Sequence, residues 1–280
     1  MRATPEPRLK VWTATGVTAL THWISEPMFY AVLQGEKGVE VGGQTYRLTA
    51  GEGISTSCGL PIAGHVAAAS PTAPYMAISL DLDVDLLVDV MLDMPKAEDR
   101  WSCSAARGTL DGTLRDAFGR LLELLPDDDD RAFLWRRREA EFYYRLLRGP
   151  MGDTLRQLNP HHERRHRIKA VTDWLIGHAK DPVTVADLAA RARMSVTSFH
   201  RHFRAITGQS PLAFQRQVRL LEARRLLESG DMGVTQVAFA VGYNSASQFS
   251  REYKALFGWP PVTDLPASLN SEARRAARDG

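Results

Sequence analysis

Two stretches of the chain carry polar side chains whose types and spacing suit the recognition of duplex DNA. They run from Ser195 to Gly208 and from Ser245 to Gly258, and six equivalent positions, each 50 residues apart, hold the same or a similar residue. Arginine can donate two hydrogen bonds to guanine O6 and N7, glutamine can pair with adenine in the same way, and lysine binds phosphate. A repeat of this regularity indicates a duplicated unit.

Each stretch has the periodicity of an amphipathic helix. Apolar residues recur at i, i+4 and i+7, which places them on one stripe that must face a core. The opposite face holds hydrogen-bond donors and acceptors, and we predict that these side chains contact DNA. The predicted contacts are Thr197, Ser198, His200, Arg201, Arg204, Asn244, Ser247, Gln248, Arg251 and Lys254.

The two helices are expected to divide the work of recognition. Arg201 and Arg251 occupy equivalent positions and are predicted to read bases, while Arg204 and Lys254, one turn later, are predicted to bind phosphates. We expect the first helix to dominate the affinity because more basic side chains lie near it. These are Arg191, Arg193, His200 and His202.

A short helix precedes each stretch, and one longer helix joins the two units. Residues 187–193 and 236–241 are rich in small apolar side chains and lead into a tight turn, as in a helix-turn-helix. The segment from Pro211 to Ser229 has helical spacing and a proline at its first position, and it would be about 28 Å long at ~1.5 Å per residue. Because B-DNA repeats about every 34 Å, helices at the two ends of this linker are expected to enter successive segments of the major groove.

Residues 165–264 resemble the double helix-turn-helix DNA-binding domain of the AraC family of transcription regulators. The shared motifs are the Met194-Ser195 turn, Gly208-Gln-Ser-Pro211, Arg219-Leu-x-x-Ala223, and Val241-Gly-Tyr followed by Ser245. After Gly258 the chain reads Trp-Pro-Pro, where the broader family has Ser-Pro followed by a Tyr-Arg pair. Together with the amino-terminal half, this ending is similar to a subgroup that carries a cupin-like sensory domain. The resemblance implies a regulator that binds DNA with one half and an effector with the other.

Residues 20–82 are expected to form this sensory domain. Short apolar runs alternate with glycine turns, such as Gly42-Gly43 and Ala50-Gly-Glu-Gly53, which is typical of a small antiparallel barrel or sandwich. The segment resembles the cupin-like effector-binding barrel of the same subgroup. We expect a small, partly apolar effector between the sheets, lined by inward residues of the strands that contain Phe29, Val32 and Ile78. Because side chains alternate along a strand, which of these residues face inward depends on the register.

Residues 83–149 show helical spacing and are predicted to connect the barrel to the next domain or to a second subunit. The run Asp127–Asp130 lacks the glycine turn and the distal glutamate of a calcium loop, so we interpret it as the acidic start of a helix. The Arg136–Arg138 run lies close to Trp135 and Phe142. We interpret it as the charged outer face of a helix packed by its aromatic residues, with DNA contact as the alternative.

The composition indicates an α+β protein with two halves of different charge. The 280 residues are 44% hydrophobic, which is enough for separate cores. Residues 151–280 carry 19 Lys and Arg against 12 Asp and Glu, whereas residues 1–150 carry 16 against 21. The basic half is therefore the one expected to bind phosphates. The predicted domains are a cupin-like antiparallel β-barrel at 1–85, a helical connector with a dimerisation role at 86–160, and an all-α double helix-turn-helix domain at 161–280.

The histidine and cysteine positions argue against a metal or catalytic centre. His22 and His65 are far apart in the sequence and form no His-x-His pair, the arrangement that metal-dependent cupins use. Cys58 as a nucleophile would require a base that the sequence does not identify. A histidine-containing stretch before the DNA-binding half is interpreted as a polar linker, with a metal site as the alternative; its histidines are His161, His162 and His166. We therefore predict no metal, no cofactor and no catalytic residue.

The sequence thus predicts a sequence-specific DNA-binding transcription regulator that senses a small molecule. A cupin-type enzyme fused to a DNA-binding domain is the alternative from another class, and a DNA-binding protein without an effector is the second alternative. The predicted partners are duplex DNA and a small-molecule effector, with RNA polymerase and a second copy of the chain as further candidates. No apolar run reaches the length of a membrane span, and two cysteines, Cys58 and Cys103, fit a reduced, cytoplasmic protein.

Overall fold

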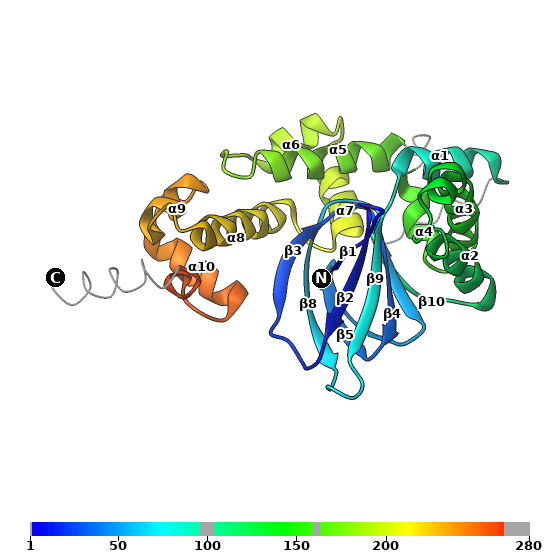
Figure 1. Cartoon of the computed structure of the whole chain (residues 1–280). Coiled ribbons are helices and arrows are strands. Elements are labelled where there is room, and N and C mark those ends of the chain that lie inside the picture. Colours follow the sequence, from blue (N-terminus) through cyan, green and yellow to red (C-terminus); the bar gives the residue numbers. More distant parts are fainter. Residues whose placement is uncertain (1, 96–103, 159–162, 266–280) are drawn as a thin grey trace.

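The protein consists of a β-barrel with one group of helices on its outer face and a second group on its other side (Figure 1). The computed structural model describes residues 2–95, 104–158 and 163–265. The first group holds helices α1–α4 and the second holds helices α5–α10. The predicted α+β fold class, with a barrel before an all-α double helix-turn-helix, is confirmed.

The strands of the described ranges form two antiparallel sheets that face each other. The order is β1-β2-β9-β4-β7-β10 in the larger sheet and β3-β8-β5-β6 in the smaller one. Their bounds are β1 Arg2–Ala3, β2 Leu9–Ala14, β3 Thr21–Ser25, β4 Met28–Gln34, β5 Glu36–Val41, β6 Gln44–Thr49, β7 Glu52–Thr56, β8 Leu60–Ala68, β9 Tyr75–Asp81 and β10 Ala105–Thr109.

Glycine sets the geometry of the hairpin between β5 and β6. Val41 pairs with Gln44, so the connection has only two residues, Gly42 and Gly43. Their φ angles are 60° and 73°, and two-residue hairpin turns of this type need positive φ at both central positions. The predicted Gly-Gly turn is confirmed, and it projects from the sheet toward the DNA-binding half.

Side chains on the larger sheet alternate between two separate cores. On β4, Tyr30 and Val32 point between the two sheets, whereas Phe29 and Ala31 point toward the helices on the outer face. The inner core continues beyond the barrel into the DNA-binding half, where it includes Phe199. The barrel and the first helix-turn-helix therefore share buried apolar surface.

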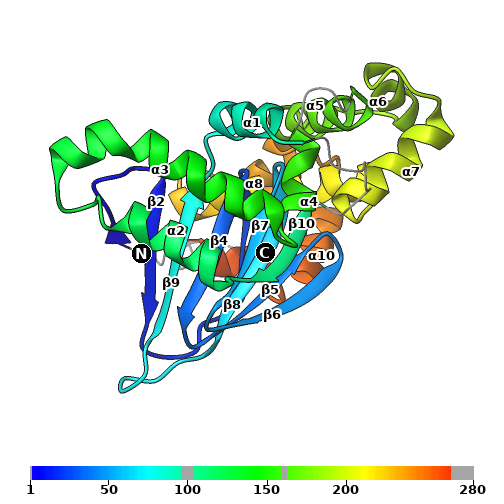
Figure 2. The ribbon, with the colours of Figure 1, turned by 90° about the vertical axis from the view of Figure 1, so that its right-hand side faces the viewer.

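Helices α1–α4 cover the outer face of the larger sheet (Figure 2). Helix α3 begins after Asp127, whose carboxylate accepts hydrogen bonds from the backbone N–H groups of Asp129 and Asp130. The interpretation of the aspartate run as a helix start is thus confirmed. The helices, with a short 3-10 turn η1, are α1 Val84–Asp93, α2 Gly112–Leu122, α3 Asp128–Arg148, α4 Gly152–Leu155 and η1 Arg156–Leu158.

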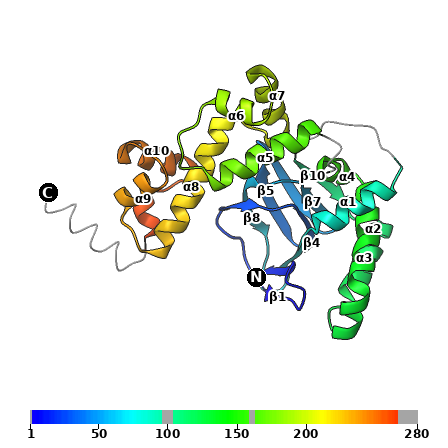
Figure 3. The same ribbon diagram turned by 90° about the horizontal axis from the view of Figure 1, so that it is seen from above.

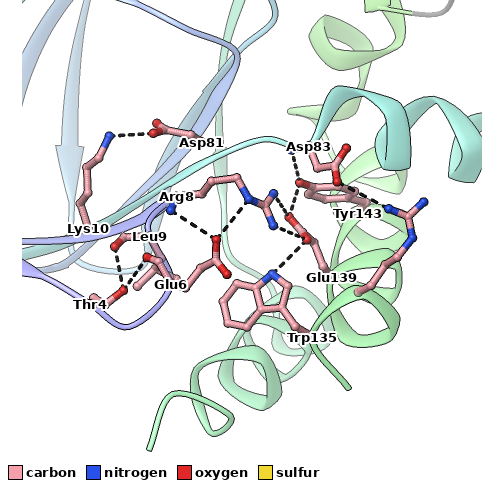
Figure 4. Close-up of polar contacts among 11 residues, drawn as sticks. Thr4, Glu6, Arg8, Leu9, Lys10, Asp81, Asp83, Trp135, Glu139 and Tyr143 are labelled. Atoms are coloured by element: carbon pink, nitrogen blue, oxygen red, sulfur yellow. Dashed lines mark hydrogen bonds and ion pairs between the residues drawn. The ribbon is translucent and has the colours of Figure 1, made fainter. Parts of the chain in front are cut away.

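A buried carboxylate on α3 binds the amino-terminal segment to this helical layer (Figure 4). Glu139 is 1% exposed and accepts two hydrogen bonds from the Arg8 guanidinium, at 2.7 and 2.9 Å. Trp135 Nε1 and the Tyr143 hydroxyl also donate to Glu139, at 3.0 and 2.5 Å. With four donors, the buried charge is fully compensated. The hydrogen bonds that Arg8 donates to Glu139 raise the pKa of Arg8, which stays charged.

The arginine run on α3 is engaged within the protein. Arg136 lies 3.6 Å from Asp83 and 3.3 Å from Asp89, Arg137 lies over the ring of Phe133, and Arg138 is 3.5 Å from Glu141. The predicted charged outer face of an aromatic-packed helix matches these contacts. None of the helices in the described ranges is both long enough and apolar enough to cross a membrane.

The second group of helices is arranged around α8 (Figure 3). Helix α8 runs from Pro211 to Ser229, as predicted, and is capped by the Ser210 hydroxyl and by Gly230 with φ 75°. Short helices and recognition helices lie at both of its ends. The remaining elements are α5 Glu163–Gly177, α6 Val185–Arg191, α7 Val196–Thr207, α9 Val234–Ala240, α10 Ala246–Phe257 and the 3-10 turn η2 Pro261–Asp264.

The barrel contacts both ends of the DNA-binding half. The N–H of Ser104 donates to the carbonyl of Ile206 at 2.9 Å, and the ring of His22 on β3 lies edge-on to Phe257, with 5.0 Å between the ring centres. Gly208, at the end of α7, lies so close to the hairpin that a side-chain carbon there would overlap the carbonyl of Gly42. The barrel thus packs against both recognition helices near their carboxyl ends.

Adding one methyl group at Gly208 is expected to disturb this contact. Gly208 and Gly258 end equivalent helices with φ 77° and 88°, but no atom lies within 4 Å of a methyl at Gly258. Gly258→Ala should cost about 1–2 kcal/mol, because only the backbone conformation is strained. Gly208→Ala should cost about 1–3 kcal/mol more, because it also overpacks the hairpin contact. Chemical denaturation of both variants measures the difference, and equal losses would contradict the tight packing at Gly208.

Candidate DNA-binding site and effector cavity

Two helix-turn-helix units present the predicted DNA-contacting residues. Helices α6 and α7 form the first unit, and α9 and α10 form the second. Ser195 and Ser245 cap the recognition helices by accepting the N–H of the residue three positions later. Apolar side chains of each recognition helix are fully buried, as predicted from the stripe; they include Phe199, Phe203, Phe249 and Tyr253.

The turns of the two units share a hydrogen-bonding pattern but differ in length. In the first turn the N–H of Met194 donates to the carbonyl of Ala189, and in the second the N–H of Tyr243 donates to that of Ala238. These pairs are 49 residues apart, whereas the recognition helices are 50 apart. The second turn therefore contains one extra residue. The left-handed position is Gly242 in the second turn and Arg193, with φ 52°, in the first.

The ten predicted DNA contacts all lie on or next to the recognition helices, outside the cores. Nine of them are exposed and Ser198 is half-buried. Arg201 and Arg251 have no ion pair or hydrogen-bond partner among the described residues, and neither have Arg204 and Lys254. Because a recognition face must present unpaired donors to bases and phosphates, this arrangement suits DNA binding.

Gln248 differs from the other predicted base-reading residues. Its side-chain amide donates to Glu252 at 3.1 Å. Glu252 also accepts a hydrogen bond from the Tyr243 hydroxyl at 2.7 Å and lies 3.9 Å from Arg216. Gln248 must leave Glu252 before it can pair with a base. At this position of the second recognition helix, base contact therefore requires that an existing hydrogen bond be broken, which the sequence did not indicate.

One basic residue expected near the first recognition face is not available there. His202 is only 7% exposed and belongs to the buried side of α7. Its position, three residues after the buried Phe199, places it beside the apolar stripe, which explains the difference. Arg191 stacks over the ring of Trp174 at 4.0 Å, so it is also engaged. The exposed bases of the first unit include His200, Arg193 and Arg201.

Helix α8 contributes one half of its length to each unit. Phe214 and Val218 pack in the core with the first recognition helix, and Leu220, Ala223 and Leu227 pack in the core with the second. Helix α8 passes from the first core to the second between Val218 and Leu220, which is within one helical turn. One rigid helix therefore positions both units.

Arg219 lies at this change of core and binds both units at once. Its guanidinium donates to the carbonyls of Ala179, Lys180 and Asp181 in the loop before α6, at 2.5 to 3.2 Å. It also donates to the carbonyl of Gly242, in the turn of the second unit, at 3.1 Å. Burial lowers the pKa of Arg219, and the four carbonyl oxygens replace the water that it loses. The sequence marked this residue as a motif position but did not predict its role.

A cavity of about 360 Å³ lies inside the barrel, between the two sheets. Its apolar walls include Trp12, Trp23, Ile24 and Met28. Phe29, Val32 and Ile78, whose strands were expected to line it, are not among its lining residues. Phe29 and Ile78 belong to the outer core with α1–α3, because they lie one position out of phase with the inward-facing residues. Val32 does point between the sheets but is fully buried in the inner core.

Four polar side chains of the barrel cavity form two pairs, and one lysine of the cavity has no acidic partner among the described residues. Lys10 lies 2.6 Å from Asp81, and Trp12 Nε1 donates to the Ser79 hydroxyl at 2.8 Å. Lys37 lies with its ammonium over the rings of Trp23 and Tyr30, at 5.6 and 5.4 Å. Burial lowers the pKa of Lys37. The cavity therefore combines aromatic walls with one partly desolvated cation.

A second cavity, of about 650 Å³, lies between strand β3 and helices α8 and α9. His22 and Trp23 line it from the barrel, and Arg219, Glu222 and Arg225 line it from α8. Its two arginines are engaged within the protein, since Arg219 binds backbone carbonyls and Arg225 lies 2.6 Å from Glu222, and its lysine, Lys180, is exposed to solvent. This cavity separates the barrel from the linker helix over part of their contact.

The described residues contain no group of three His, Cys, Asp or Glu side chains that could hold a metal ion. His22 contacts Phe257, and the ring of His65 occupies the space above Gly38 on the neighbouring strand. His166 is exposed on α5. His161 and His162 lie outside the described residues, and so does Cys103.

Two helix-turn-helix units on one linker helix, joined to a barrel with an internal cavity, define a DNA-binding protein with a sensory domain. Residues 5–154 match the family described as AraC-type transcriptional regulator N-terminus, and residues 188–264 match a helix-turn-helix domain. The first match spans more than half of the chain, so the protein belongs to the AraC-type transcriptional regulators. It is a transcription regulator with a helix-turn-helix DNA-binding domain and the N-terminal domain of this family.

Curated relatives match about a third of the chain. The transcriptional activator RhaS of Escherichia fergusonii is 33% identical over 95 residues, which are 34% of this chain and 34% of RhaS. RhaS of Pectobacterium carotovorum is 30% identical over 109 residues, or 39% of this chain and 37% of that protein. The chain thus spans about a third of the length of these relatives.

The fold of the whole chain is similar to that of ToxT from Vibrio cholerae. The structure of ToxT with a bound unsaturated fatty acid covers 94% of this chain and 96% of its own, with a TM-score of 0.55 and 11% sequence identity. Another structure, of a ToxT variant without ligand, gives a TM-score of 0.57 at 9% identity and covers 94% of this chain and 98% of its own. At this identity the likeness establishes the shared fold.

Replacing Arg219 is expected to loosen both units without removing a DNA contact. Arg219→Ala leaves the carbonyls of Lys180 and Gly242 without a side-chain donor, while Gln215 still donates to those of Ala179 and Asp181. The variant should lose about 2–4 kcal/mol of unfolding free energy. Arg219→Lys should restore little, because one ammonium cannot match the planar guanidinium fork. The matched control is Arg225→Ala on the same helix, where an exposed pair with Glu222 is lost and little change is expected. Urea denaturation and operator binding of the three variants test this, and a wild-type-like Arg219→Ala protein would contradict the proposed role.

Proposed function

We propose that this regulator reads an operator through α7 and α10 together and responds to a small molecule bound in its barrel. The observation that supports the DNA reading is the equivalent placement of Arg201 and Arg251. Both are exposed, and both lie on helices that α8 holds at its opposite ends. The predicted division into barrel, helical connector and DNA-binding domain at residues 85 and 160 stays part of this proposal.

The two arginines are expected to contribute sequence-specific affinity. Arg201→Ala and Arg251→Ala should each cost about 1–3 kcal/mol of operator binding and relax specificity at one end of the site. Arg201→Ala should be the more damaging change, because α7 is flanked by further exposed bases. Quantitative binding to the operator and to random DNA separates these effects. A larger loss in Arg251→Ala, or an equal loss on random DNA, would overturn the assignment.

Phosphate contacts should behave differently from base contacts. Arg204→Ala and Lys254→Ala should weaken binding to operator and random DNA alike, because a phosphate contact carries no sequence information. Each change should lower the slope of log affinity against log salt by about 1, since one fewer counterion is released. Titrations at several salt concentrations measure the slopes, with Lys169→Ala as the control because Lys169 is paired with Asp173 on α5. Unchanged slopes would show that neither residue binds phosphate.

The barrel cavity is the proposed effector site. Its volume lies at the lower end of the range for ligand sites, about 300–1,000 Å³, and its walls are apolar with a few polar groups. A ligand that prefers the DNA-competent conformation would shift the population toward it. ToxT, which shares the fold, has been crystallised with a fatty acid.

Effector binding is tested on the full chain, because the inner core joins the barrel to the first helix-turn-helix. A metabolite library that includes sugars, amines, acids and neutral apolar compounds is screened by thermal shift. We expect at least one compound to raise the melting temperature and to change operator affinity. If no compound stabilises the protein, the sensing role fails.

The alternatives from the other function classes make different predictions. A cupin-type enzyme would need metal ligands in the barrel, and the described residues bring no such group together. We propose that the chain has no enzymatic activity; metal analysis with turnover assays tests this. A purely architectural protein would bind random DNA as tightly as the operator. RNA polymerase and a second copy of the chain stay proposed partners, and a regulator of chromosomal DNA is expected to work in the cytoplasm.

A further inference from the structure

Lys37 lines the barrel cavity and forms no ion pair among the described residues. Lys37 lies on β5, where inward positions alternate, and its side chain points between the sheets together with Val39 and Val41. On the neighbouring strand β8, Gly64 leaves room for it. A methyl group at Gly64 would lie 3.2 Å from Lys37 Cε and 3.0 Å from the Trp23 ring. The fold thus brings a lysine stem into the barrel interior and leaves space around it.

No acidic side chain neutralises Lys37 within the described ranges. Asp81 is bound by Lys10 at 2.6 Å, and Glu26, which also lines the cavity, is exposed to solvent. The hydroxyl of Tyr30 forms a 2.5 Å hydrogen bond with Tyr75. The Trp23 and Tyr30 rings attract the ammonium through their faces but do not replace the acceptors that its three N–H donors require.

An unpaired charge in a low-dielectric cavity is unfavourable unless a partner arrives. From this geometry we infer that the cavity takes a small organic monocarboxylate, whose carboxylate binds Lys37 and whose apolar body lies between Trp12, Trp23 and Met28. The inference rests on the proposed effector site and names its ligand class. The cavity of about 360 Å³ limits the ligand to a small acid with one aromatic ring or a short aliphatic chain.

The second cavity does not fit the same ligand class as well. Its arginines already bind carbonyls or carboxylates of this chain, so a ligand acid would have to displace them. Lys37 needs no such displacement. The barrel cavity is therefore the site to which the inference is assigned.

The test compares acids with their neutral amides on the full chain. The probes are 3-phenylpropionate and octanoate, each paired with its amide, and binding is measured by isothermal titration calorimetry. We expect each acid to bind about tenfold or more tightly than its amide, because a hydrogen bond to a charged group is stronger than a neutral one. Equal binding of acid and amide, or no binding of either acid, would overturn the inference without any variant being made.

Lys37→Met removes the charge and keeps the length of the side chain. It should lower the affinity for each acid to that for its amide, whereas the control Lys169→Met should keep the preference for acids. The melting temperature of Lys37→Met should equal or exceed that of wild type, because a partly desolvated ammonium is removed. A preference for acids that survives in Lys37→Met would exclude Lys37 as the partner.

The same experiments separate this inference from effector sensing in general. If a sugar, an amine or a neutral compound stabilises the protein while the acids do not bind, the sensing role stands and the carboxylate inference fails. If no compound of any class binds, both fail together.

Discussion

The arrangement of the DNA-binding half depends on one guanidinium group. Arg219 is the only side chain described that donates to backbone carbonyls of both helix-turn-helix units, and it does so from the point where α8 passes from one core to the other. Each unit alone has a small core, so its orientation on a single helix would be weakly determined by apolar packing. Hydrogen bonds are directional, and four of them in one planar fork restrict the rotation of the two units about α8.

Much of the DNA-binding half could be predicted from the sequence because its signals are local. A 3.6-residue apolar period, serine caps and the glycines after each recognition helix determine helix positions within one chain segment. The duplication then placed Arg201 and Arg251 on equivalent exposed positions. His202 was wrongly expected near the DNA-binding face. The apolar stripe of its helix was defined by three residues only, and a side chain at the edge of the stripe can be buried or exposed. The hydrogen bond from Gln248 to Glu252 joins residues four apart on α10 and was not predicted.

The barrel was harder to predict because its interior depends on register between distant strands. The strands β3–β9 lie within residues 20–82, where the barrel was expected, but β1 and β2 precede this segment. Strand β10 lies in the segment expected to be helical, and its sequence Ala-Ala-Arg-Gly-Thr has little intrinsic preference for a strand. The sequence named the strands of Phe29 and Ile78 but left their register open, and both side chains lie on the outer face, because a shift of one position moves a side chain to the other face. Side chains alternate along β5, so Lys37 lies on the same inward face as Val39 and Val41. This pattern could have predicted from the sequence that a lysine lines the barrel cavity.

The Gly42-Gly43 hairpin of the barrel and Gly208 of the first recognition helix fit together only because Gly208 carries no side chain, since a methyl group there would overlap the Gly42 carbonyl oxygen. Here a sensory half from another protein would bring a hairpin of its own, and its shape would have to match the end of α7. Whether a chimaera between related regulators folds would therefore depend on the contact between the hairpin and Gly208. The hairpin and the glycine would have to be taken from the same protein.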